Sequence, residues 1–286
     1  MSIKNIKVKT ANIFRTLWAQ IESELIIQLS YPVDFIGSVF TALFVGMWII
    51  SFALAVSEGG ENSNKFSGIA VFGLIIFFFF SSSLWSIGTF IRRRQLQGTL
   101  ESIWLSPSDK ILVTIGSAIG GYIIMFFANV LIVLGFMLIV PIHFGSVLWG
   151  TIVLLISFIQ SLGIGFIIGA LFVKVKQVNA LNNLIQFSTM IISAVFFPFS
   201  VFPSWFLWIS RLYPFSWTVD AFRVAMKVLE KPELLPNSFM LFGFIPPFYT
   251  EMIILTIISV TLLAIGIIAF KKAIKNAIKK GTLSQY

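Results

Sequence analysis

Residues 92–110 read RRRQLQGTLESIWLSPSDK, and this charged stretch interrupts two long apolar runs. The runs on either side, residues 66–91 and 111–140, each exceed the roughly 20 mostly apolar residues that cross a bilayer as a helix. The sequence therefore predicts that the chain crosses a membrane on both sides of this stretch, and that the stretch itself lies outside the hydrocarbon.

The composition is that of a membrane protein. Of the 286 residues, 58% are hydrophobic and 11% are charged, whereas soluble domains are about 25% charged. The mean hydropathy is +0.98. Cysteine is absent and His143 is the one histidine, in a short turn after Pro141. Disulfides, thiolate zinc sites, multi-histidine metal sites and thiol nucleophiles are thereby excluded, and no catalytic or metal-binding residue is predicted.

Six apolar stretches predict membrane-spanning helices in an all-α fold, with one domain over residues 1–286. They are residues 33–56, 66–91, 111–140, 147–173, 180–202 and 248–270.

Charge gives the orientation of these spans. Most of the 20 lysines and arginines lie in the N-terminal tail, the second and fourth connections, and the C-terminal tail. The positive-inside rule then places both termini in the cytoplasm, in a multi-pass protein of the cytoplasmic membrane. The first 30 residues contain no compact apolar core of a signal peptide, so no cleaved leader is expected. The net charge of +9 is read as a topology signal, with no nucleic-acid partner.

The segment before the first span, residues 10–30, predicts an amphipathic helix in the cytoplasmic interface of the bilayer. Its apolar residues recur at helical spacing, and Trp18 would anchor it. Simple anchoring and contact with a partner both remain open for this helix.

Within residues 92–110 the pattern predicts a short amphipathic helix parallel to the membrane. Leu96, Leu100, Ile103 and Trp104 share one face, and Thr99 is a candidate cap. The following residues 106–109, Ser-Pro-Ser-Asp, are interpreted as a capping box that starts the next span. We expect a rigid element that points out of the bilayer; an ordinary cytoplasmic turn is the alternative.

Residues 203–247 form the longest outer connection. They are rich in tryptophan and phenylalanine but are broken by prolines. This combination favours short re-entrant helices that dip into the outer leaflet. Asp220 and Arg223 are three residues apart and are predicted to pair on one of these helices.

The fifth predicted span carries a polar stripe. Asn179, Asn182, Asn183, Gln186, Thr189 and Ser193 recur at helical spacing. Lipid penalises such a stripe, so it faces protein or a water-accessible path. Interhelical hydrogen bonding and pathway lining are both open; the candidate pathway residues are Asn182, Gln186, Thr189 and Ser193.

Charged side chains within the other spans are few. Asp34 and Glu251 fall in first turns, where capping is the favoured interpretation. Ion coupling therefore has few candidate residues. No G-x-x-x-x-G-K-[ST] loop is present, so the chain has no such phosphate site. Small residues four apart, Gly116 with Gly120 and Gly165 with Gly169, suit close helix packing.

Two segments resemble a known family. GTLESIWLSP, from Gly98 to Pro107, is similar to the motif between the second and third spans of ABC-2-type transporter permeases. LYPFSWTVDAFRVAM, from Leu212 to Met226, resembles the region before the last span in that family.

The resemblance implies a permease subunit of an ABC exporter that moves an amphipathic substrate outward. Residues 92–110 would carry the coupling helix that seats in a separate cytoplasmic ATPase subunit. The matching residues are Gly98, Thr99, Leu100, Glu101, Leu105, Ser106 and Pro107. Residues 203–247 would be the outer re-entrant helices, with Pro214, Asp220 and Arg223 in the external gate.

The resemblance also implies the partners. ATP and Mg would bind the ATPase subunit, with no cofactor on this chain, and a second permease copy or paralogue would complete a two-plus-two assembly in the lipid bilayer. Two alternatives stay open. An ion-coupled secondary carrier or channel would work without an ATPase, and a structural membrane subunit would only anchor a partner. The substrate cannot be read from the sequence.

Overall fold

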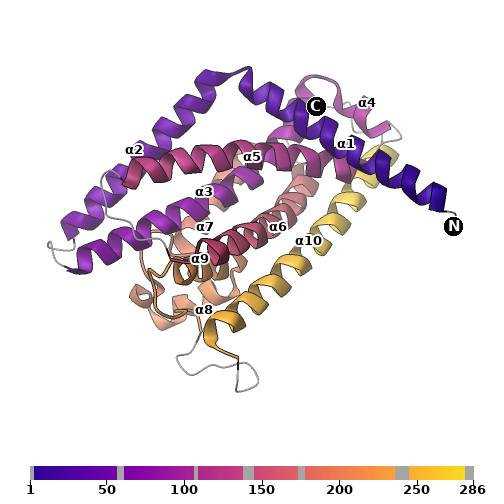
Figure 1. Cartoon of the computed structure of the whole chain (residues 1–286). Coiled ribbons are helices and arrows are strands. Elements are labelled where there is room, and N and C mark those ends of the chain that lie inside the picture. Colours follow the sequence, from indigo (N-terminus) through magenta and orange to yellow (C-terminus); the bar gives the residue numbers. More distant parts are fainter. Residues whose placement is uncertain are drawn as a thin grey trace.

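A computed structural model describes residues 3–56, 61–105, 109–137, 145–172, 178–235 and 245–280. Every regular element in these ranges is helical, which confirms the all-α prediction (Figure 1). The α-helices are α1 (Ile3–Leu29), α2 (Pro32–Val56), α3 (Glu61–Leu96), α4 (Leu100–Leu105), α5 (Lys110–Met137), α6 (Val147–Phe172), α7 (Val178–Ile192), α8 (Ser204–Leu212), α9 (Pro214–Ala225) and α10 (Pro247–Lys280), with a 3-10 turn at Phe199–Val201.

Three of these helices are long and apolar enough to cross a membrane. They are Lys110–Gly135 in α5, Val147–Leu171 in α6 and Pro247–Lys279 in α10. Shorter apolar segments lie in α2, at Phe35–Trp48, and in α3, at Gly68–Ser81. The described helices therefore support a membrane location, while the count of six spans stays a prediction.

The fifth predicted span differs most from the structure. Residues 180–202 were expected to be one helix, but α7 ends at Ile192. Ala194 then takes a positive φ of 48°, and the 3-10 turn follows Pro198. Pro198 restricts the backbone of the residue directly before it, so it does not explain an end at Ile192. At 1.5 Å per residue, α7 is about 22 Å long, shorter than a bilayer core of about 30 Å.

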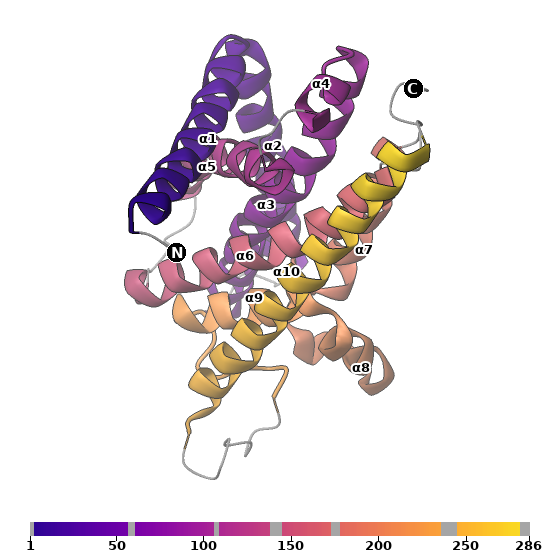
Figure 2. The same cartoon turned by 90° about the vertical axis from the view of Figure 1, so that its right-hand side faces the viewer.

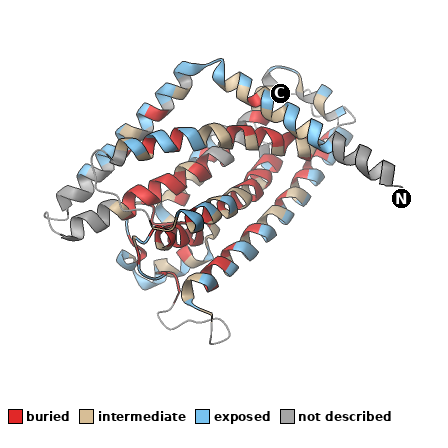
Figure 3. Cartoon of the chain, viewed as in Figure 1, coloured by how far each residue is buried: buried red, intermediate tan, exposed pale blue. Residues whose placement is uncertain are grey.

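The helix α3 lies at the centre of the molecule. α2, α5, α6, α7 and α9 all pack against it, and α10 packs mainly along α6. Buried residues concentrate in α3, α6 and α9 (Figure 3). Figures 1 and 2 place α4 and the C-terminal end of α10 at one end of the bundle, with α8 and α9 toward the other end. We call these the α4 end and the α9 end.

Glycines permit two close helix contacts. A Cβ atom on Gly163 of α6 would lie 2.6 Å from the carbonyl carbon of Leu262, and one on Gly266 of α10 would meet Gly163 in turn. Cβ atoms on Gly116 and Gly120 of α5 would each lie 2.8 Å from a Cβ atom of α1. The close packing predicted for Gly116 and Gly120 is confirmed.

Candidate functional site

The α4 segment is held to α3 by a left-handed glycine. Gly98 has a φ of 65°, and a Cβ atom there would meet nothing within 4 Å. The Thr99 N–H donates to the Arg94 carbonyl over 3.0 Å, as in a Schellman helix end. α4 begins at the next residue, Leu100. The predicted short helix is therefore present, and its direction relative to α3 is fixed by backbone hydrogen bonds.

The described part of α4 presents side chains outward. Leu105, one of the residues matching the family motif, is 66% exposed, and Ser102 is exposed as well. Leu100 and Glu101 lie in the helix, but their side chains are outside the described part of the structure, as are Ser106 and Pro107 altogether.

The start of α5 corrects the capping-box prediction. α5 begins at Lys110, and Asp109 is itself the cap, because its Oδ1 accepts from the Ile111 N–H over 3.0 Å. The predicted box assigned the cap to Ser106 and the start of the helix to Pro107. The Asp109 carboxylate, two residues before the N–H that donates to it, performs this role alone.

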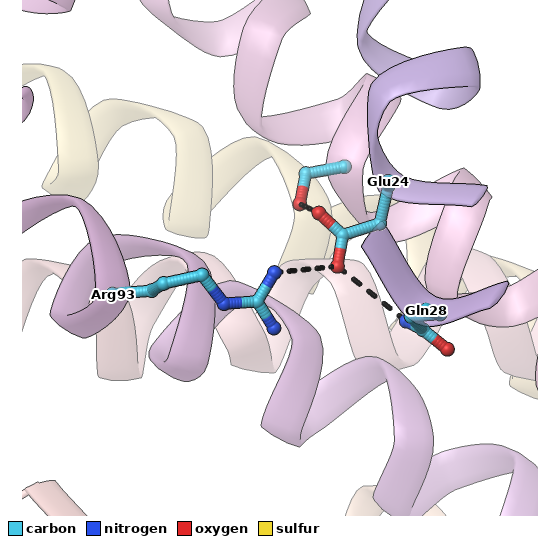
Figure 4. Close-up of polar contacts among 4 residues, drawn as sticks. Glu24, Gln28 and Arg93 are labelled. Atoms are coloured by element: carbon cyan, nitrogen blue, oxygen red, sulfur yellow. Dashed lines mark hydrogen bonds and ion pairs between the residues drawn. The ribbon is translucent and has the colours of Figure 1, made fainter. Parts of the chain in front are cut away.

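A buried carboxylate ties α1 to α3 and α5 (Figure 4). Glu24 of α1 accepts from Arg93 of α3 over 3.3 Å and from the Ser117 hydroxyl of α5 over 3.2 Å, with Gln28 also donating to it. Arg93 lies five residues before Gly98. The helix α1 is therefore bonded to protein on one face, while Trp18 on another face is 58% exposed.

Glu24 and Arg93 are expected to be energetically coupled. Glu24→Ala should lower the thermal unfolding midpoint. Adding Arg93→Ala to that variant should lower it little further, because both changes remove the same interaction. The coupling free energy should be about 1 kcal/mol, since Arg93 is partly exposed. A double-mutant cycle in detergent measures this. Arg92→Ala is the control, and its effect should add to that of Glu24→Ala. Additive effects for Arg93 as well would contradict the contact.

Arg223 organises the α9 end. It is fully buried on α9 and donates to the carbonyls of the turn after α7 and to α3. The acceptors are the carbonyl oxygens of Ala194 and Val195, both at 2.8 Å, and of Phe197 and Ile69, at 3.2 to 3.3 Å. The carbonyls of Ala194, Val195 and Phe197 lie in the non-helical turn after α7, so the guanidinium supplies donors that a longer α7 would have provided.

The predicted pair of Asp220 with Arg223 is wrong. No ion pair within 4 Å joins these two described residues. Asp220 Oδ2 instead accepts from the Glu233 and Leu234 N–H groups at 2.9 and 2.8 Å, which fastens the segment after α9. Burial raises the pKa of Asp220 to about 7, against the lowering effect of the bond from Leu234.

Pro214 begins α9, and its carbonyl accepts from Gln160 of α6 over 2.9 Å.

Glu251 also differs from its predicted role. It is fully buried as the fifth residue of α10, and neither carboxyl oxygen has a hydrogen-bond partner. Its carboxyl group lies close enough to the carboxyl group of Asp220 of α9 for the two to interact electrostatically. It is therefore a buried carboxyl group and does not cap the helix. The side chain of Asp34 lies outside the described part of the structure.

Three of the six residues of the polar stripe, on α7 or directly after it, are bonded to other parts of the protein. Gln186 accepts from Trp85 and donates to Ser81 of α3, at 3.1 and 3.0 Å. Thr189 bonds to Tyr213, and Ser193 accepts from Ser216 of α9 over 3.3 Å. Asn182 differs, since it is fully buried and its amide atoms have no partner. In this chain the stripe therefore connects helices, and pathway lining stays a prediction.

The comparison with known families decides the class of protein. The family model for the ABC-2 type transporter matches residues 35–227, which is more than half of the 286 residues. The chain belongs to the ABC-2 type transporter family. No curated protein matches the chain.

The match spans both segments that carried the resemblance. It covers helices α2 to α9, and thus the α4 segment and the buried cluster around Arg223. This ABC-2 type transporter chain is a transmembrane component of an ABC-type transporter, with apolar helices that fit a membrane location.

Proposed function

We propose that the chain is the permease subunit of an ABC exporter, and that a separate cytoplasmic ATPase subunit docks on α4. The observation that carries this proposal is α4 itself, a short helix within the family match that is fixed to α3 at Gly98 and exposes Leu105. Such an element can transmit force only if it moves with the spanning helix behind it, and the backbone bonds at Gly98 provide that link.

The route from α4 into the membrane domain runs through α3. ATP and Mg would be bound by the ATPase subunits, whose closure would pull on α4. Because α3 packs against α2, α5, α6, α7 and α9, its movement would reach the α9 end directly. There the turn held by Arg223 and the helices α8 and α9 would form the external gate. The proposed result is outward movement of an amphipathic substrate.

The proposal fixes the orientation and the assembly. The α4 end and both chain termini would face the cytoplasm, with the chain in the cytoplasmic membrane. A second copy or a paralogue would face this permease across the pathway.

Substitutions in α4 are expected to release the ATPase. The chain is co-expressed with the ATPase encoded beside it and purified in lipid. Leu105→Asp and Leu100→Asp should each reduce co-purified ATPase at least tenfold, because a buried leucine contributes about 1.5–3 kcal/mol and an unpaired charge adds a penalty. Glu101→Ala should lower ATP turnover in the complex.

The exposed neighbour Gln97 provides the control. Gln97→Ala should leave both binding and turnover close to the wild-type values. Wild-type chain that binds no ATPase would contradict the proposal, as would full ATPase binding by both aspartate variants in folded protein.

The ion-coupled carrier gains one feature from the structure. Asp220 and Glu251 form a buried carboxyl pair, of the kind that carries protons in coupled transporters. A carrier of this kind would transport in vesicles without any ATPase and would stop when a protonophore collapses the gradient. The exporter requires ATP in the same assay, so the two functions give opposite results.

A further inference from the structure

A second site lies away from α4, in a cavity of about 360 Å³ between α3, α5, α6 and α9. Its walls are aromatic and aliphatic side chains, with Asn129 and Thr151 as the polar residues that line it. This volume is within the range of small-molecule sites in proteins. Apolar cavities exclude water and accept apolar guests, so the walls favour an apolar occupant.

Asn129 adds a specific polar atom to these walls. It is 2% exposed, and its Nδ2 donates to the Met125 carbonyl of the same helix over 2.9 Å. A carbonyl oxygen can only accept, so this bond fixes which end of the amide is nitrogen. The amide oxygen, Oδ1, is buried and has no hydrogen-bond partner. A buried acceptor of this kind is costly unless a donor reaches it.

The cavity opens on the outside of the bundle. Phe126, Val130 and Leu134 of α5 line it and are exposed on the outside of the bundle, as is Val147 of α6. Both helices are candidate membrane spans. No charged side chain lines the cavity among the described residues. A charged group would lose its hydration there without compensation, whereas a hydroxyl could donate to Asn129.

We propose that this cavity binds an uncharged amphiphile from the membrane, with its apolar chain between α3, α5 and α6 and its hydroxyl donating to Asn129 Oδ1. Long-chain alcohols and neutral hydroxylated lipids have this chemistry. The inference rests on the cavity, the unpaired oxygen and the lipid-facing mouth. It does not depend on the ATPase partner or on the direction of transport.

Photolabelling of the full chain in phosphatidylcholine nanodiscs tests the site. The probes are a diazirine analogue of hexadecan-1-ol and its methyl ether, which has the same chain but no donor. Mass spectrometry should locate the alcohol label on cavity residues of α3, α5 and α6. Asn129→Leu should reduce alcohol labelling about tenfold and leave ether labelling unchanged, since one hydrogen bond is lost.

Two further variants test access to the cavity independently of the hydrogen bond to Asn129. Val130→Trp should block both probes because it fills the mouth, and Leu155→Trp, an exposed position on α6 outside the cavity, should block neither. Equal labelling by alcohol and ether in the wild type would overturn the hydroxyl assignment. Absence of label from the cavity residues would overturn the site.

A second copy of the chain is the remaining occupant to test. The chain lacks cysteine, so Val130→Cys introduces a single thiol. Disulfide-linked dimers of this variant would show that the face is covered by protein, and would overturn the proposal. A resident lipid and a transported lipid share the proposed chemistry. In the reconstituted complex, ATP should reduce alcohol labelling only if the alcohol is transported.

Discussion

Replacing Arg223 with methionine is expected to lower the thermal unfolding midpoint strongly and to reduce the yield of folded protein. The guanidinium donates to the carbonyls of Ile69, Ala194, Val195 and Phe197, the first three of which belong to buried residues. Methionine has similar length but no donor. Each buried carbonyl that loses its one donor costs about 1–3 kcal/mol, which is a large part of the stability of a typical domain. Thermal unfolding and the monodisperse fraction on size exclusion measure the loss.

Arg211→Met is the matched control for Arg223→Met. Arg211 is half-buried on α8, donates to the Leu234 carbonyl over 2.9 Å and lies over the Trp208 ring. Water can replace much of that contact, so a shift of a few degrees is expected. Arg223→Lys should fall between the two, because one ammonium group cannot reach all four carbonyls. Equal midpoints for Arg223→Met and Arg211→Met would contradict the role assigned to Arg223.

Gly163→Leu is expected to separate α6 from α10. The Cβ position of Gly163 lies 2.6 Å from backbone atoms of Leu262 and Leu263, so the helices cannot keep their spacing. In a membrane, helices associate through close packing and not through the hydrophobic effect, so the loss has no apolar compensation. The cost should exceed the 1–3 kcal/mol typical of overpacking, because backbone has to move.

The measurement is the yield and thermal midpoint of the purified chain. Gly37→Leu is the control, since Gly37 lies on α2 with nothing within 4 Å of its Cβ position. That variant should behave like the wild type. If Gly163→Leu and Gly37→Leu gave the same midpoint, the close contact between α6 and α10 would not be needed for stability.

The lengths of the apolar stretches in the sequence correctly predicted those helices that each coincide with one uninterrupted stretch. Residues 33–56 and 147–173 were expected to be helical, and the structure has Pro32–Val56 and Val147–Phe172. These bounds follow from local composition, with prolines, glycines and charges at the ends. The short helix after Gly98 was predictable for the same reason, because a glycine that ends one helix and a new apolar pattern both occur within ten residues.

The misassigned features depend on contacts between distant residues. The early end of α7 is associated with the hydrogen bonds of Arg223, which is about 30 residues away along the chain. Asp220 and Arg223 have the spacing of a helical ion pair, but in the structure each side chain is hydrogen-bonded to backbone groups instead. Neither the bond from Arg93 to Glu24 nor the unpaired oxygen of Asn129 leaves a signal in a single sequence.

The joint at Gly98 has a mechanical consequence. α3 has 36 residues and is therefore about 54 Å long. Because backbone bonds attach α4 to its end, α3 and α4 form a lever with a short arm set at an angle. A tilt of α3 by about 5° around its far end would shift α4 sideways by roughly 5 Å, given that length. A small rotation of α3 in the core would therefore move α4 sideways by several ångströms, and a force on α4 would rotate α3 in turn.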